Sequence, residues 1–186
     1  MKPMLATAWS GEDPARWLMS QKLDGLRAIW TGKELLSREG HAFRPPAWWT
    51  AGLPDMVLDG ELYGGPGTLS KVSGMFRRSV PIDAEWRAVR LHVYDAPEAR
   101  GGIVEREAAY RVALDGGGVA VAVEHVRCIG VEHLVEVAAG ILAAGGEGVC
   151  LRHPSASYQP GRSRNLVKFK PAEFHQHEIM MHLAMA

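Results

Sequence analysis

Short apolar stretches, either alternating with polar residues or unbroken, recur along the chain and are bounded by Gly, Pro or Asp. Such stretches are typical of β-strands. The strand-like ranges are 17–23, 26–30, 34–37, 56–63, 89–94, 119–129, 148–152 and 165–169. Because Asp24-Gly25 separates the first two, this pattern predicts that they form a β-hairpin.

Helical spacing of apolar residues is found in the ranges 68–78, 104–114 and 131–144. The third ends at Gly145-Gly146, a pair typical of helix C-termini. Helices therefore fall irregularly among strands, which predicts an α+β fold with mainly antiparallel sheet. A regular βαβ alternation and a G-x-x-x-x-G-K-[ST] loop are both missing from the sequence, so we expect neither a doubly wound dinucleotide fold nor a P-loop.

Length and composition are those of an ordinary globular protein. The 186 residues suffice for one domain with a short tail, and 47 % are hydrophobic. No apolar run approaches the roughly 20 residues of a membrane span, and the N-terminus does not resemble a signal peptide. Cys128 and Cys150 lie too far apart for a zinc site and are expected in strands. A reduced, cytoplasmic protein is the expectation.

Charge is balanced, with 21 basic and 21 acidic residues. A nucleic-acid partner would therefore be held by a local basic patch, because the overall field does not favour a polyanion.

Five short motifs follow one another along the chain: QKLDGLR at 21–27, LDGELY at 58–63, VYD at 93–95, EGVCLR at 147–152 and VKFK at 167–170. Singly, each has an ordinary explanation, such as a solvated lysine or an exposed edge strand. Together and in this order, they resemble the covalent nucleotidyltransferases, the family of DNA ligases, RNA ligases and mRNA capping enzymes. The SREG sequence at 37–40 and the tryptophan-rich context resemble the compact bacterial and phage type of ATP-dependent DNA ligase.

The resemblance implies that Lys22 attacks the α-phosphorus of ATP and becomes covalently linked to AMP. Asp24, Lys168 and Lys170 complete the implied catalytic set. An amine attacks only when unprotonated, whereas free lysine is almost fully protonated at neutral pH. Nearby cations such as Lys168, Lys170 and Arg27 would lower the pKa of Lys22.

Nucleotide and metal contacts are implied as well. Mg²⁺ (or Mn²⁺) would be bound by Glu147 and Glu61, since this metal prefers oxygen ligands and keeps several waters. Glu61 is alternatively a ribose contact. Tyr94 stands where the family stacks an aromatic ring on the purine. The implied nucleotide-binding residues are Gln21, Lys22, Arg27, Glu61, Tyr94, Glu147, Lys168 and Lys170.

Nicked double-stranded DNA is the implied partner of a monomeric chain. Its phosphates would be bound by arginines, whose guanidinium groups match phosphate oxygens. The implied DNA-binding residues are Arg27, Arg38, Arg77 and Arg78. For Arg77 and Arg78, a solvated helix face is an equally good reading. Arg152, Arg162 and Arg164 are weaker candidates in a loop rich in Gly, Ser and Pro.

Residues 1–172 are predicted to form the nucleotidyltransferase domain, and 173–186 a tail with three histidines where an OB-fold domain would begin. Without that domain, we expect slow self-adenylylation and weak DNA binding.

Two alternatives remain open. An RNA ligase or capping-type enzyme would reveal itself by 2′-hydroxyl dependence or a preference for GTP. A non-catalytic nucleotide- or DNA-binding remnant would bind nucleotide reversibly.

Overall fold

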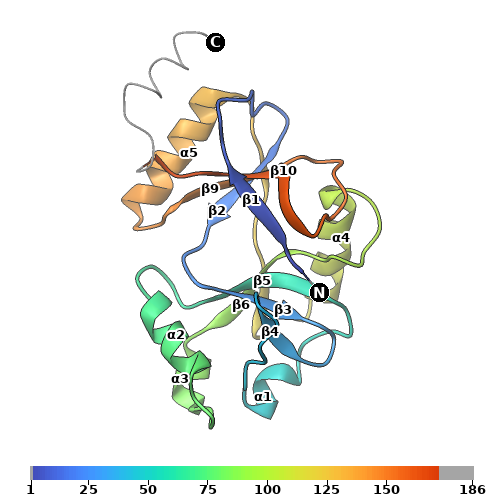
Figure 1. Ribbon diagram of the computed structural model, residues 1–186, viewed down its shortest axis with the longest axis vertical. Helices are drawn as coiled ribbons and strands as arrows, with labels where there is room; N and C mark the ends of the chain where they lie inside the picture. The colour runs from blue at the N-terminus through green and yellow to red at the C-terminus, as the bar shows by residue number, and fades with distance from the viewer. Residues whose placement is uncertain (1, 172–186) are drawn as a thin grey trace.

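The computed structural model describes residues 2–171, which form two five-stranded sheets and five helices (Figure 1). Sheet A has the strand order β1-β10-β9-β2-β8, and sheet B the order β4-β3-β5-β6-β7. Strand pairs are antiparallel except β1 with β10 and β6 with β7. The predicted α+β fold with mainly antiparallel sheet is confirmed.

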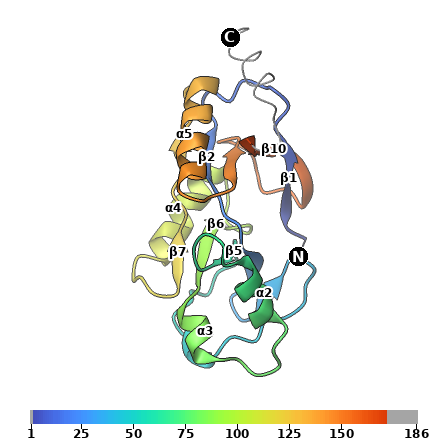
Figure 2. The ribbon, with the colours of Figure 1, turned by 90° about the vertical axis from the view of Figure 1, so that its left-hand side faces the viewer.

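Sheet A is built from the two ends of the described chain. Its strands are β1 (Met4–Ala8), β2 (Leu18–Lys22), β8 (Val126–Arg127), β9 (Gly148–Arg152) and β10 (Gly161–Phe169). Helix α5 (Val131–Ala143) packs on it, with Leu134 and Ala138 fully buried. Figure 2 shows α5 at the end of the molecule opposite α3.

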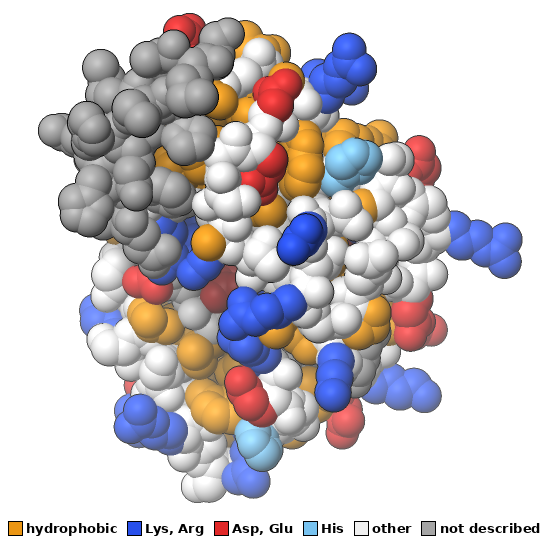
Figure 3. Space-filling model, turned by 45° about the horizontal axis from the view of Figure 1, so that its top comes forward, with side chains coloured by type: hydrophobic (Ala, Val, Ile, Leu, Met, Phe, Trp, Pro, Cys, Tyr) orange, Lys and Arg blue, Asp and Glu red, His pale blue; other side chains and the backbone are white. Residues whose placement is uncertain are grey.

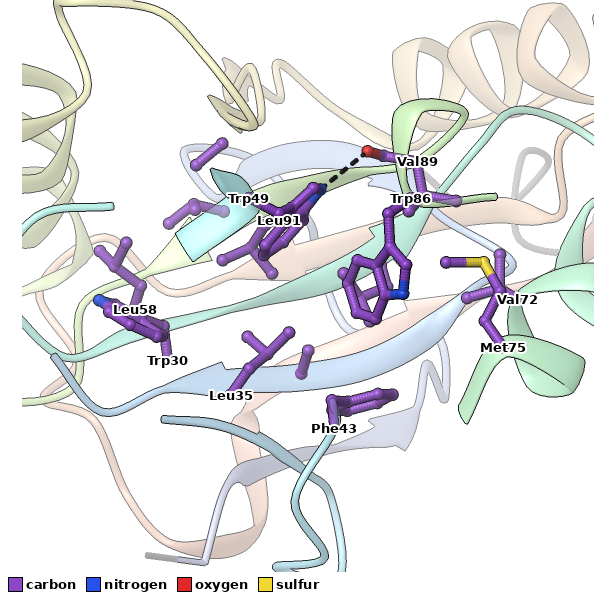
Figure 4. Close-up of a cluster of buried hydrophobic side chains, with 14 of the residues drawn as sticks. Trp30, Leu35, Phe43, Trp49, Leu58, Val72, Met75, Trp86, Val89 and Leu91 are labelled. Carbon is purple, nitrogen blue, oxygen red and sulfur yellow. Dashed lines mark hydrogen bonds between the residues drawn. The ribbon is translucent and has the colours of Figure 1, made fainter. Parts of the chain in front are cut away.

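Sheet B is built from the middle of the chain. Its strands are β3 (Leu26–Trp30), β4 (Leu35–Ser37), β5 (Leu58–Tyr63), β6 (Arg90–Asp95) and β7 (Ala120–Ala122), and its helices are α1 (Ala47–Thr50), α2 (Leu69–Phe76), α3 (Asp83–Arg87) and α4 (Ile103–Ala113). Figure 4 shows the apolar cluster between this sheet and its helices. Trp49 packs edge-on against Trp86 at 5.0 Å between ring centroids, and its indole N–H donates to the Val89 carbonyl at 3.5 Å. Close packing in this cluster fixes the strands of sheet B and so the positions of the side chains on its other face.

The predicted hairpin at Asp24-Gly25 is wrong, because β2 and β3 belong to different sheets. Strand β2 pairs with β8 and β9, whereas β3 pairs with β4 and β5. Gly25 carries the crossover so close to β5 that an added Cβ would lie 2.3 Å from the Leu62 carbonyl oxygen. Asp-Gly marks a tight change of direction, but it does not determine which strands pair.

The single strand predicted at 119–129 is also wrong, since that stretch is divided between β7 in sheet B and β8 in sheet A. The predicted helices correspond to α2, α4 and α5, and the strand expected at 165–169 starts earlier, at Gly161. Strand β1 and the short helices α1 and α3 were not predicted from the sequence. Among residues 2–171, no helix is both long and apolar enough to cross a membrane.

Candidate active site

A cavity of about 350 Å³ lies between the two sheets and is lined from both. It gathers eight of the residues proposed from the motifs: Gln21, Lys22, Arg27, Arg38, Glu61, Tyr94, Lys168 and Lys170. These residues are spread over some 150 positions of the sequence, so the fold places motif residues together that are distant along the chain.

Glu147 joins this group by contacting two of its lysines. One carboxylate oxygen contacts Nζ of Lys22 and the other contacts Nζ of Lys170. Burial raises the pKa of Glu147, but the hydrogen bonds from Lys170 and Lys22 outweigh it, and the net pKa lies below its ordinary value. Glu147 is therefore ionised at neutral pH and pairs with both lysines, which leaves the cluster with one net positive charge.

Gly148 explains how Glu147 reaches this position. Lys22, the last residue of β2, stands opposite Gly148 in the ladder between β2 and β9. A Cβ on Gly148 would lie 2.3 Å from the carbonyl oxygen of Phe169 in β10. Only glycine permits this close approach, which brings Glu147 and Lys170 together beside Lys22.

Glu61 and Tyr94 come from sheet B, on the facing wall. Glu61 stands opposite Arg27 in the ladder between β3 and β5, and the Tyr94 hydroxyl donates to its carboxylate at 3.3 Å. Burial raises the pKa of Glu61 to about 7, against the opposing charges of Arg27 and Lys22. The pKa of Glu147 is therefore lowered and that of Glu61 raised. Such opposite shifts allow one site to hold a charged and a protonated carboxyl group at the same pH.

Two guanidinium groups lie against the Tyr94 ring, with Arg27 at 5.3 Å and Arg152 at 5.1 Å from its centroid. These are cation–π distances. The expected placement of Arg152, Arg162 and Arg164 in a loop is wrong, because Arg162 and Arg164 lie in β10, and Arg162 also lines the cavity. Arg152 lies in β9 and is almost fully buried. Its contact is an aromatic ring and a buried carboxylate.

Each of these arginines is held by a fully buried aspartate. Arg27 binds Asp59 through both carboxylate oxygens, with Nε to Oδ1 at 2.8 Å, and Nη1 of Arg152 donates to Asp95 at 2.9 Å. The Tyr158 hydroxyl also donates to Asp59, at 2.7 Å. Sequence reasoning missed these aspartates. Their signal was an acidic residue inside an apolar strand, which is rarely tolerated without a cationic partner.

Three predicted residues lie elsewhere. Asp24 is exposed and does not line the cavity. Arg78 pairs with Glu85 through two hydrogen bonds of 2.9 Å, and Arg77 lies beside it in a separate shallow depression after α2. Arg38 is exposed at the cavity rim. Figure 3 shows that basic side chains are spread over the middle of one face, with acidic ones among them.

A metal site made only of protein ligands is absent from residues 2–171, because no three His, Cys, Asp or Glu side chains converge there. The separate carboxyl groups of Glu147 and Glu61 nevertheless offer the oxygen ligands that Mg²⁺ prefers, since this ion usually takes one or two carboxylates together with phosphate oxygens and water. The histidines at 175, 177 and 182 lie outside the described residues.

Among known sequences, a DNA ligase of Haemophilus influenzae is 32 % identical over 182 residues, which cover 96 % of this chain and 67 % of the relative. A DNA ligase of Halorubrum lacusprofundi is 35 % identical over 127 residues, which cover 62 % of this chain and 21 % of the relative. No protein-family model matches the chain.

Among solved structures, one from a study of DNA binding by Lig E DNA ligases matches with a TM-score of 0.84 and 30 % identity, covering 91 % of this chain and 68 % of that one. Chlorella virus DNA ligase-adenylate matches with a TM-score of 0.75 and 20 % identity, covering 91 % and 67 %. The ATP-dependent DNA ligase of bacteriophage T7, in complex with ATP, matches with 0.70 and 18 %, covering 91 % and 68 %. The last two show the likeness of the fold.

Proposed function

This chain belongs to the DNA ligase family, and we propose that it is an ATP-dependent enzyme that forms a covalent lysyl-AMP intermediate at Lys22. The observation that carries the proposal is the position of the Lys22 amine. It meets Glu147 and Lys170 in a cavity whose facing wall holds Glu61 and Tyr94.

In the proposed first step, the nitrogen of neutral Lys22 attacks the α-phosphorus of ATP. A nitrogen–phosphorus bond forms, the bond to the bridging oxygen breaks, and pyrophosphate leaves with its electrons. In the free protein the Lys22 amine is held in an ion pair with Glu147. Lys22 must therefore lose both its proton and its contact with Glu147 before it attacks.

The cavity walls suggest how ATP is held. Tyr94 offers a flat face to the purine, provided that the base displaces or stacks beside a guanidinium group. Glu61, which accepts a hydrogen bond from the Tyr94 hydroxyl, would contact the ribose or serve as the second metal ligand. Gln21, Lys168 and Lys170 line the wall of sheet A, where the two lysines balance phosphate charge.

Mg²⁺ (or Mn²⁺) fits the site through Glu147 and, as a second ligand, Glu61. It would supply charge neutralisation at the phosphates. Glu147 becomes free for this role only if Lys22 and Lys170 bind other anions, and the phosphates of ATP are such anions.

DNA is proposed as the second substrate. AMP would pass from Lys22 to the 5′-phosphate of a nick in duplex DNA, and the 3′-hydroxyl would then displace AMP. Arg38 at the rim is the best placed phosphate contact, and Arg27 lies deeper. Arg77 is a more available backbone contact than Arg78, whose guanidinium is already bound by Glu85.

We further propose that residues 1–172 act as the nucleotidyltransferase domain of a monomeric, cytoplasmic enzyme. Gel filtration with light scattering would test the monomer directly.

The deciding experiment is incubation with ATP labelled on the α-phosphate and Mg²⁺, followed by denaturing electrophoresis. Lys22→Ala is the test variant, and Lys33→Ala, an exposed lysine outside the cavity, is the matched control. We expect label on the wild type and on Lys33→Ala, and none on Lys22→Ala.

Label on Lys22→Ala would contradict the proposal. So would an unlabelled wild type whose intact mass also shows no AMP adduct. Label from GTP alone, or sealing of nicked RNA alone, would favour the RNA ligase or capping alternative. Reversible nucleotide binding without label would favour a non-catalytic module.

A further inference from the structure

The Asp95 carboxylate, which follows Tyr94 in β6, is fully buried and accepts four hydrogen bonds. Arg106 donates from Nε to Oδ1 at 2.6 Å and from Nη2 to Oδ2 at 3.1 Å. The Ala96 N–H donates to Oδ1 at 2.8 Å, and Nη1 of Arg152 donates to Oδ2 at 2.9 Å. Since a carboxylate offers about four acceptor sites, Asp95 is saturated and acts as a fixed anchor.

Arg106, on α4, holds this anchor from the side away from the cavity. Its side chain is 2 % exposed and does not line the cavity. Besides Asp95, its Nη1 donates to the carbonyl oxygens of Gly101 and Ala156, both at 2.9 Å. Ala156 lies in the loop between β9 and β10, so Arg106 ties sheet B to the connection within sheet A.

Arg152 is the member of this network that reaches the cavity. It lines the wall and its guanidinium carbon lies 5.1 Å from the Tyr94 ring centroid. Within residues 2–171, Asp95 accepts the hydrogen bond that Arg152 makes, and the buried Nε of Arg152 has no partner. The place of this guanidinium therefore depends on Asp95.

The network has two buried cations for one buried anion, which is an unbalanced charge. Replacing a buried ion network by apolar side chains is often neutral or stabilising, so stability alone does not explain it. We propose that Arg106 is a positioning residue of the nucleotide site. Through Asp95, it holds Arg152 against Tyr94 and thereby shapes the base-binding end of the cavity. This inference rests on the proposed use of ATP.

A double-mutant cycle tests the proposal. The rate of self-labelling would be measured over a range of ATP concentrations for Arg106→Met, Arg152→Met and the double variant. We expect Arg106→Met to raise the KM for ATP about tenfold while kcat changes less than about threefold. Because Arg106 acts through Arg152, the double variant should show the KM of Arg152→Met within about twofold.

Arg111→Met is the matched control on the same helix. Its guanidinium binds Glu107 and the Val123 carbonyl and not the cavity, so its KM should equal that of the wild type. If Arg106→Met does not fold, Arg106→Lys enters the same cycle. It keeps one charge but cannot reproduce the planar fork, and it should also raise KM.

Additive KM effects in the cycle would overturn the proposal, and so would a loss of kcat at unchanged KM in both Arg106 variants. A wild type that takes no label would instead count against the proposed function. The same cycle would then be read from equilibrium ATP binding, measured by tryptophan fluorescence, where coupling between Arg106 and Arg152 is still expected. Additivity in that readout would overturn the positioning role independently.

Discussion

Two groups of ion pairs border the cavity, and they differ in exposure. In sheet A, Lys22, Glu147 and Lys170 have side chains that are 23 %, 26 % and 21 % exposed. In sheet B, Asp59 and Asp95 are 0 % exposed. Water can replace partners in the first group at little cost, but not in the second. Ionic partners can therefore exchange around Lys22, whereas the buried aspartates hold their arginines in a fixed geometry.

The largest expected effect falls on the exposed group. Lys22→Ala should reduce AMP labelling by roughly 10³-fold or more, since no other amine takes its place. The free energy of unfolding should change by less than about 1 kcal/mol, because Glu147 keeps Lys170 as its partner. Labelling and urea denaturation on one preparation check both values. A large loss of stability would contradict the low cost of partner exchange around Lys22.

For the buried group we expect the opposite. Asp95→Ala leaves Arg106 and Arg152 buried without a counter-ion and should cost about 4 kcal/mol of unfolding free energy. Urea denaturation measures this cost. An effect below about 1 kcal/mol would show that sheet B relaxes as easily as sheet A.

The Glu61 carboxyl group is expected to have an intermediate effect on stability, and this effect depends on pH. Its pKa of about 7 in the folded state exceeds its ordinary value of 4.5, so the folded state binds the proton more tightly between these values. Its contribution to stability is therefore greatest below about pH 4.5 and declines as the pH rises through 7. Between about pH 5 and about pH 8, the free energy of unfolding of the wild type should fall by on the order of 2 kcal/mol relative to that of Glu61→Gln.

Urea denaturation at several pH values, in buffer with a metal chelator, checks this decline. A difference between wild type and Glu61→Gln that is constant with pH, or that grows in favour of the wild type, would contradict it.

The smallest effect is expected at the surface pair of Arg78 and Glu85, 46 % and 31 % exposed. Glu85→Ala should cost less than about 1 kcal/mol. The same urea measurement gives the free-energy cost of breaking a largely exposed ion pair, against which the two cavity groups can be judged. Glu85→Ala also frees Arg78, so tighter binding of duplex DNA should accompany the small loss of stability.

The sequence predicted the elements whose signals are local and the residues whose chemistry is tied to a motif. Helix α5 has regular apolar spacing and a glycine stop, and Lys22, Glu147 and Lys170 lie in ordered motifs. Partners that depend on tertiary contacts were missed. Nothing near Asp95 in the sequence indicates that Arg152 and Arg106 converge on it. Strand β1 pairs in parallel with β10, which is distant in sequence, so no hairpin turn beside β1 indicates that it is a strand.

Sheet B is formed by the continuous segment 26–122, whereas sheet A needs strands from both 4–22 and 126–169. On the ribosome, sheet B can therefore close while the chain is still growing. Strands β1 and β2 cannot pair with β10 and β9 until these have been synthesised. Until then their edges are exposed and can pair with the wrong strands. Lys22 consequently meets Glu147 and Lys170 only after residues 147–170 have been synthesised. A nascent chain that has emerged only as far as sheet B carries the nucleophile without its ionic partners.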